Sequence, residues 1–226
     1  MRHLEERLEA RRQQLKQQRE ALRETLHRSP EDLTQQRMDR AKALYREITE
    51  QLELVGQLLR EQRQTLADGE TLKRSFDIML QATLLRTAVG DDDFSRVERQ
   101  FIREIAETGD VVDWVNQTYH GKEELTWGKL YYLEEAESAA LMDYIADNSR
   151  ELMEQVFLPL ALADRLFQKS RKQAFLDRVE AICQIFTAID GDGDNQQEAQ
   201  ALRRALDLYF ELPIWAAERK AREMEG

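Results

Sequence analysis

The chain has 226 residues, of which 42% are hydrophobic and 34% are charged, with nine glycines and three prolines. Because helix breakers are scarce, this composition predicts an all-α protein with one compact core. The net charge of -11 argues against nucleic acid as a partner. No apolar run approaches the roughly 18 residues that a membrane span needs, so membrane insertion is not expected. A single cysteine and a charged N-terminal segment predict a cytoplasmic location.

Residues 1–70 are predicted to form a charged coiled-coil arm of two helices. The first, over residues 2–28, has few apolar positions, and Ser29 and Pro30 then favour a new helix start. The second, over about 31–67, has an apolar seam at alternating spacings of three and four: Met38, Ala41, Tyr45, Ile48, Leu52, Val55 and Leu59. Gly69 is expected to end the arm. The first helix either folds back as an antiparallel hairpin or leaves the seam for a homodimer.

Residues 71–226 are predicted to form a separate domain of amphipathic helices. We expect helices over 71–89, 94–108, 110–118, 123–147, 150–168, 171–189 and 195–211, followed by a short tail. No segment shows the sustained alternation of a strand. Cys183 lies on an apolar helical face and is expected to be a buried, unreactive thiol.

The domain contains an internal repeat with a period of 100 residues. The segment TAVGDDDFSRVERQFIR, residues 87–103, aligns without a gap to TAIDGDGDNQQEAQALR, residues 187–203, with six of seventeen positions identical. The identical positions include Thr87 and Thr187, and Glu98 and Glu198. This pattern indicates a duplicated unit of helix, acidic loop and helix.

The two acidic loops are candidate metal sites, because clustered carboxylates supply the oxygen ligands that Ca²⁺ or Mg²⁺ prefer. The candidate ligands of the second loop are Asp190, Asp192, Asp194 and Glu198. Those of the first loop are Asp91, Asp92, Asp93 and Glu98. The alternative is that these Asp and Gly residues only end one helix and cap the next.

The second loop matches several ligand positions of an EF-hand, but Ala201 stands where the closing Glu is required, so an EF-hand is not expected. The segments Ala188–Glu198 and Ala88–Glu98 instead resemble those of the TerB-like family associated with bacterial tellurite resistance. The resemblance covers roughly residues 71–212. It implies two related helical halves, acidic loops that hold divalent metal, and a role in stress-response or membrane-associated assemblies. Gly90, where the second copy has Asp190, weakens the expectation for the first loop.

Other chemistry has little support in the sequence. Metalloprotease, nucleotide-binding and serine-hydrolase motifs are lacking. The aromatic and acidic segment from Trp127 to Tyr144 is either core packing or a partner groove with an acidic rim. Trp215, beyond the predicted last core helix, either packs back or anchors a partner.

The leading hypothesis is a non-enzymatic protein-interaction or scaffold module of a bacterial stress-response type. Its arm and acidic domain would bind protein partners, and its loops would hold a divalent cation as the one expected cofactor. One alternative is a structural coiled-coil dimer or adaptor without metal. The other is a metal-dependent hydrolase whose loop carboxylates hold the ion.

Overall fold

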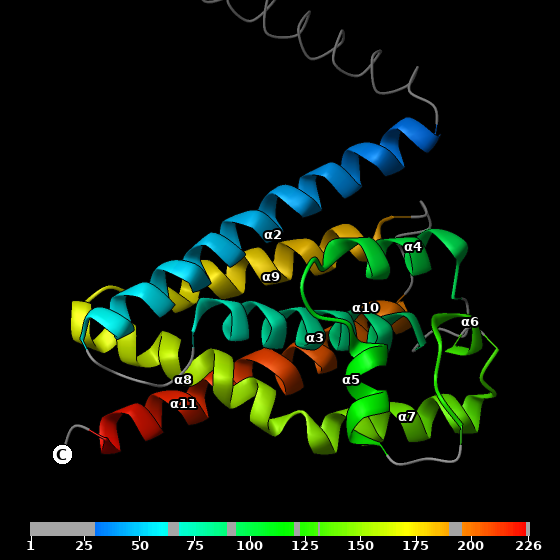
Figure 1. Ribbon diagram of the computed structural model, residues 1–226. Coiled ribbons are helices and arrows are strands. Elements are labelled where there is room, and N and C mark those ends of the chain that lie inside the picture. The colour runs from blue at the N-terminus through cyan, green and yellow to red at the C-terminus, as the bar shows by residue number, and fades with distance from the viewer. Residues whose placement is uncertain are drawn as a thin grey trace, which may run out of the picture. The chain divides into compact units, whose positions relative to one another are not determined.

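The computed structural model describes residues 30–62, 68–89, 94–119, 123–130, 132–189 and 196–224. Regular structure in these ranges is entirely helical, which confirms the all-α prediction. The helices are α2 (Pro30–Glu61), α3 (Gly69–Ala88), α4 (Arg96–Ile105), α5 (Val111–Thr118), α6 (Trp127–Leu130), α7 (Glu135–Asn148), α8 (Arg150–Phe167), α9 (Lys172–Thr187), α10 (Gln196–Leu206), a π-helical turn (Asp207–Glu211) and α11 (Leu212–Glu223) (Figure 1). Over these described residues, no helix is both long enough and apolar enough to cross a membrane.

The chain divides into two compact units, residues 1–37 and 38–226. This division differs from the boundary near residue 70 that the sequence suggested. The periodic residues of the predicted seam, from Met38 to Leu59, are at most 6% exposed and belong to the same core as the helices that follow. The spacing therefore identified the buried face of α2. What covers that face is the domain itself, so the seam is not a free surface for a second chain.

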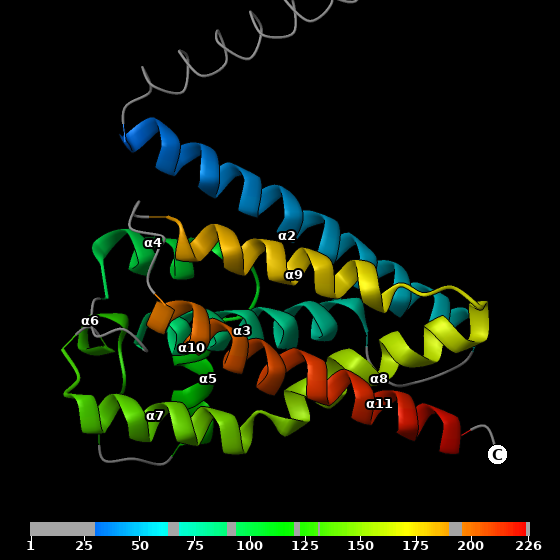
Figure 2. The same cartoon turned by 180° about the vertical axis from the view of Figure 1, so that it is seen from behind.

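The predicted first helix, over residues 2–28, lies outside the described residues. The antiparallel hairpin and a homodimer through that helix therefore stay predictions. From Met38 onward, α2 lies beside α9 (Figures 1 and 2). The Arg178 guanidinium of α9 pairs with Glu47 at 2.7 Å, and the Gln51 amide donates to the Arg171 carbonyl at 2.9 Å.

An aromatic cluster forms the centre of the core. Phe76 of α3 packs against Tyr45 of α2, Phe175 of α9 and Phe210 of the π-helical turn, with ring centroids 5.6 to 6.5 Å apart. Phe157 of α8 closes the cluster from the opposite side. Burying such large side chains is the main source of stability, at about 25 cal/mol per Å² of apolar surface.

A buried carboxylate fastens the turn between α4 and α5 to the core. Asp77 of α3 is fully buried and accepts bonds from the Tyr45 hydroxyl, from the Thr108 amide and hydroxyl, and from the Gly109 amide, at 2.7 to 2.9 Å. Burial raises the pKa of Asp77, and these four donors act against that rise. A side chain at Gly109 would lie 2.4 Å from the Arg74 carbonyl oxygen, so this turn requires glycine.

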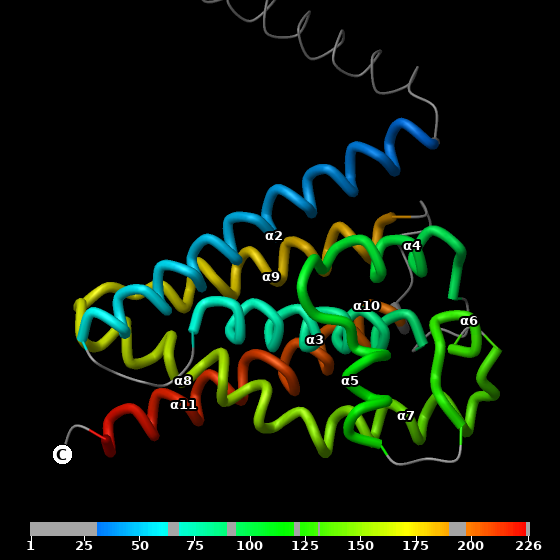
Figure 3. The backbone as a smooth tube through the Cα atoms, in the orientation of Figure 1, coloured from blue at the N-terminus to red at the C-terminus, as the bar shows by residue number. Residues whose placement is uncertain are grey.

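Three predicted helix boundaries are wrong. The predicted helix over 123–147 is two helices, α6 and α7, because a capping box between Glu134 and Glu137 starts α7. The predicted tail after residue 211 is helix α11, which packs beside α8 (Figure 3). Gly69 begins α3 instead of ending α2, because the Asp68 carboxylate accepts from the Thr71 amide as an N-cap.

The π-helical turn joins α10 to α11 without a break in the helical path. Its signature is the bond from the Leu212 amide to the Asp207 carbonyl, five residues back. Pro213 stands at the start of α11 and has no amide hydrogen to donate to the preceding turn. The helix accommodates this proline by widening over 207–211.

Candidate functional site

The two copies of the repeat occupy equivalent places in two helix–loop–helix units. The first is α3, residues 89–95 and α4; the second is α9, residues 188–195 and α10. Thr87 is the last residue but one of α3 and Thr187 is the last residue of α9, and each hydroxyl donates to a carbonyl within the same helix. Glu98 and Glu198 are the third residues of α4 and α10, and both are buried. The alignment by sequence thus corresponds to an alignment by helix position.

The structure gives Glu98 a definite local role. Its carboxylate accepts from the Ser95 amide at 2.7 Å, and the Ser95 hydroxyl accepts from the Glu98 amide at 3.2 Å. This reciprocal pair is a capping box, which satisfies two amides at the start of α4. A glutamate three residues into the helix is therefore useful to the fold, with or without a metal ion.

The six aspartates proposed as ligands, Asp91–Asp93 with Asp190, Asp192 and Asp194, lie outside the described residues. The metal sites of both loops therefore stay predictions. Within the described ranges, no three His, Cys, Asp or Glu side chains come together in a group that could hold a metal ion.

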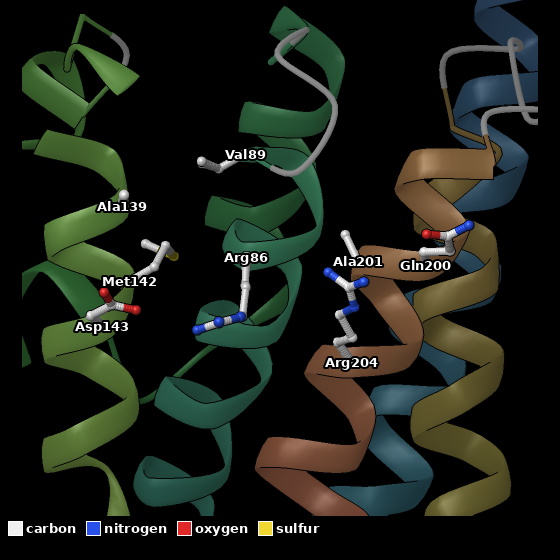
Figure 4. A pocket seen from close by; sticks show the side chains of 8 residues that line it. All are labelled: Arg86, Val89, Ala139, Met142, Asp143, Gln200, Ala201 and Arg204. Carbon is white, nitrogen blue, oxygen red and sulfur yellow. The ribbon is translucent and has the colours of Figure 1, made fainter. Parts of the chain in front are cut away.

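A pocket lies between α3, α7 and α10, and it draws on both copies of the repeat. Its volume is about 440 Å³, within the range typical of small-molecule sites. Arg86 and Val89 come from the end of the first copy's leading helix, and α10 of the second copy contributes three residues. The lining residues are Arg86, Val89, Ala139, Met142, Asp143, Gln200, Ala201 and Arg204 (Figure 4).

The pocket combines two cationic groups with an apolar wall. In Figure 4 the Arg86 side chain extends from α3 toward the side where α7 carries Asp143, and Arg204 projects from α10. The Nη1 atom of Arg86 is buried and has no hydrogen-bond partner, and no described acid forms an ion pair with this guanidinium. The hydroxyl of Tyr209 is likewise buried without a hydrogen bond of ordinary length among the described residues, and it is the polar neighbour of this guanidinium. Burial raises the pKa of Tyr209, and the Arg86 charge beside it acts in the opposite direction.

Sequence reasoning missed Arg86 and Arg204, although one signal was present. Arg86 interrupts a stretch of α3 in which nearly every residue is buried, from Phe76 to Ala88. A cation within an otherwise buried helix is unusual unless it has a partner or a function. Arg204 carries no such signal, because it lies on the polar face of an amphipathic helix.

The other predicted candidates fall into three kinds of environment. Cys183 is fully buried and burial raises its pKa, so the predicted inert thiol is confirmed as buried. Tyr119 and Tyr144 stack edge to face at 4.8 Å in a cavity of about 260 Å³, rimmed by Glu123 and Glu137. Of the aromatic and acidic residues in the segment from Trp127 to Tyr144 that the sequence offered as a partner groove, this cavity contains Glu137 and Tyr144, while Tyr119 and Glu123 come from outside that segment.

The third kind is an exposed apolar surface on α11. Trp215 is 64% exposed, with the Lys172 ammonium 5.3 Å from its ring centroid, and Leu212 is 63% exposed. Leu212 lines a groove of about 570 Å³ between α8 and α11, whereas Trp215 lines a separate cavity of about 220 Å³ on the side of α11 that faces α9. The apolar lining of the α8–α11 groove includes Met153, Leu158 and Leu208.

Comparisons of the chain with protein-family models, with curated proteins and with solved structures found no match.

Proposed function

We propose that this protein is a non-enzymatic interaction module that binds a helix of a partner protein along α11. The observation that carries the proposal is that α11 exposes two large apolar side chains next to hollows of the surface, Leu212 in the α8–α11 groove and Trp215 at the cavity toward α9. Exposed large apolar side chains at hollows of the surface are typical of protein-binding sites. Tryptophan in particular contributes strongly to binding, because it buries a large area when a partner covers it.

The groove favours an amphipathic helix as the occupant. Its floor is apolar, and its edges carry both signs of charge, with Arg150 and Arg219 among the bases and Glu223 among the acids. The Lys220 ammonium pairs with Glu154 across the two helices and holds α8 and α11 together. A partner helix would place its apolar face in the groove and its charged flanks on these edges.

The test is copurification of the tagged full chain from its native cell, with the Trp215→Ser and Leu212→Ser variants run in parallel. Leu54→Ser is the matched control, because Leu54 is also exposed but lies on α2. We expect a partner that the unaltered chain and the control retain and that the α11 variants lose. Loss of a tryptophan anchor lowers affinity about thirtyfold or more, equal to about 2 kcal/mol. Equal recovery of all partners by all variants would refute the proposal.

As part of the same proposal, the acidic loops hold a divalent cation such as Ca²⁺ or Mg²⁺. Support comes from the repeated carboxylates and from the resemblance to the TerB-like family, which would make this a stress-response scaffold. Titration calorimetry with Ca²⁺, Mg²⁺ and Mn²⁺ tests it, with Asp192→Asn as the variant. Asp147→Asn is the control, since Asp147 lies on the exposed face of α7. Absence of binding heat in the unaltered chain would remove the metal from the proposal.

A further inference from the structure

We propose that the pocket between α3, α7 and α10 binds a small organic anion, with its phosphate or carboxylate group on Arg86 and Arg204. The starting point is the state of Arg86. Its Nη1 atom is buried and, among the described residues, has no ion pair and no hydrogen bond of ordinary length; its polar neighbour is the hydroxyl of Tyr209, which carries no negative charge. A guanidinium that is buried at one end and has only a neutral hydroxyl beside it there is poorly compensated, so the arrangement points to a ligand that supplies negative charge.

Arg204 gives a second, independent indication. It follows Arg203 on α10, and the two arginines differ in their surroundings. Arg203 pairs with Asp207 at 3.1 Å and with Glu211 at 2.9 Å, whereas Arg204 lines the pocket and makes no such pair. Two guanidinium groups that form no ion pair with a described residue thus line one cavity of a chain whose net charge is -11.

The chemistry of the lining restricts the ligand class. Guanidinium groups match the planar oxygens of a carboxylate and the oxygens of a phosphate, and they bind both with paired hydrogen bonds. The Gln200 amide can add a further donor at the same edge. Val89, Ala139 and Met142 provide an apolar wall, so the anionic group should be carried on an apolar body.

The acidic side chain of the pocket supports selectivity. Asp143 lines the cavity from α7, on the side toward which Arg86 extends (Figure 4). Its carboxylate disfavours a ligand that carries negative charge at both ends, because like charges repel in a partly enclosed site. We therefore expect a compound with one anionic group to bind more tightly than one with two separated anionic groups.

The test uses phenyl phosphate, benzoate and the neutral analogue phenol as probes with the full chain. Calorimetry should detect phenyl phosphate or benzoate binding, and no binding of phenol at the same concentrations. Whichever anion binds more tightly assigns the head group. If neither anion binds at millimolar concentration, or if phenol binds as well as they do, the inference is wrong.

Three variants separate a ligand site from general electrostatics. Arg86→Met and Arg204→Met should each lower the affinity for the anion at least tenfold, because each removes charge-assisted hydrogen bonds. Arg203→Met removes the same charge one position away and should leave the affinity within about twofold. Equal losses in all three variants would refute a specific site.

The denaturant concentration at which the protein unfolds distinguishes a ligand-binding arginine from one that stabilises the fold. In the absence of a ligand, Arg86→Met should unfold at the same or a higher denaturant concentration, because it removes a charge whose buried end has only the neutral Tyr209 hydroxyl beside it. An Arg86→Met variant that unfolds well below the unaltered chain would show that the guanidinium serves the fold, and would overturn the inference. Arg204 is exposed, so Arg204→Met keeps the binding test valid whatever the stability of the first variant. This pocket and the α11 groove have no residue in common, so the two tests are independent.

Discussion

Replacing Asp77 with alanine should destabilise the protein by about 3 kcal/mol. The change leaves four donors without their acceptor. The Tyr45 hydroxyl and the Gly109 amide are buried, and each loses about 1–3 kcal/mol when unsatisfied. Thr108 is exposed, so its amide and hydroxyl can bond to water at a smaller loss, on the order of 0.5 kcal/mol each. The variant also removes the cost of burying a carboxylate, which is the reason that burial raises the pKa of Asp77, and this gain offsets part of the lost stability.

The assay is urea unfolding followed by circular dichroism and by tryptophan fluorescence, whose agreement checks that unfolding is two-state. For a domain of this size, the expected loss corresponds to a melting temperature lowered by about 6–12 °C. Asp147→Ala, an exposed aspartate on α7, should change stability by less than about 0.5 kcal/mol. A loss below about 1 kcal/mol for Asp77→Ala would refute the view that this carboxylate fastens the α4–α5 turn.

Three further changes test local features of the fold. Gly109→Ala should destabilise the protein by several kcal/mol, because the added methyl group would overlap the Arg74 carbonyl oxygen. Thermal unfolding measures the loss, and an unchanged melting temperature would contradict the prediction. Gln168→Gly should stabilise the protein by about 1 kcal/mol, because Gln168 ends α8 with a left-handed φ of 51° that glycine adopts without strain. The same thermal unfolding measurement tests this, and a less stable variant would show that the Gln168 side chain is needed. Cys183 should resist thiol reagents at pH 8 until the chain is unfolded, because burial raises its pKa and blocks access; rapid labelling of the native protein would exclude that environment.

The apolar periodicity of α2 predicts which face of the helix is buried, but it does not predict what buries it. The seam from Met38 to Leu59 is buried at every predicted position, because spacings of three and four place those residues on one face of a helix. The pattern cannot say what covers that face. A coiled-coil partner and a domain core both require a continuous apolar stripe, so the predicted arm and the observed core helix have the same sequence signature.

The helix breaks that sequence reasoning missed depend on side-chain capping. Glu134 and Glu137 form the capping box of α7, and the Thr126 hydroxyl accepts from the Lys129 amide at the start of α6. Each of these two caps depends on one or two polar side chains, and the charged and apolar residues around them are equally compatible with one continuous helix. The equivalence of Glu98 and Glu198, in contrast, was predictable, because a gapless repeat preserves helix position.

The pocket could not be predicted, because its two arginines are 118 residues apart in the sequence and come together only when α3 packs against α10. The two copies of the repeat contribute only Val89, Gln200 and Ala201 to the lining, and α7 supplies a wall that belongs to neither copy. Self-comparison of the sequence finds what two segments share. It does not find a site whose charged residues lie outside those segments, as Arg86 and Arg204 do.

The π-helical turn over Asp207–Glu211 sets the rotational phase of α11. A single extra residue in a helical turn rotates everything after it by about 100° about the helix axis. In the present phase Ile214, Ala217 and Ala221 face the core, while Leu212 and Trp215 face outward. Deleting one residue from this turn would bring Glu218 to the inward position that Ala217 occupies. The outward tryptophan of α11 is therefore a consequence of one widened turn upstream, as well as of the side chain itself.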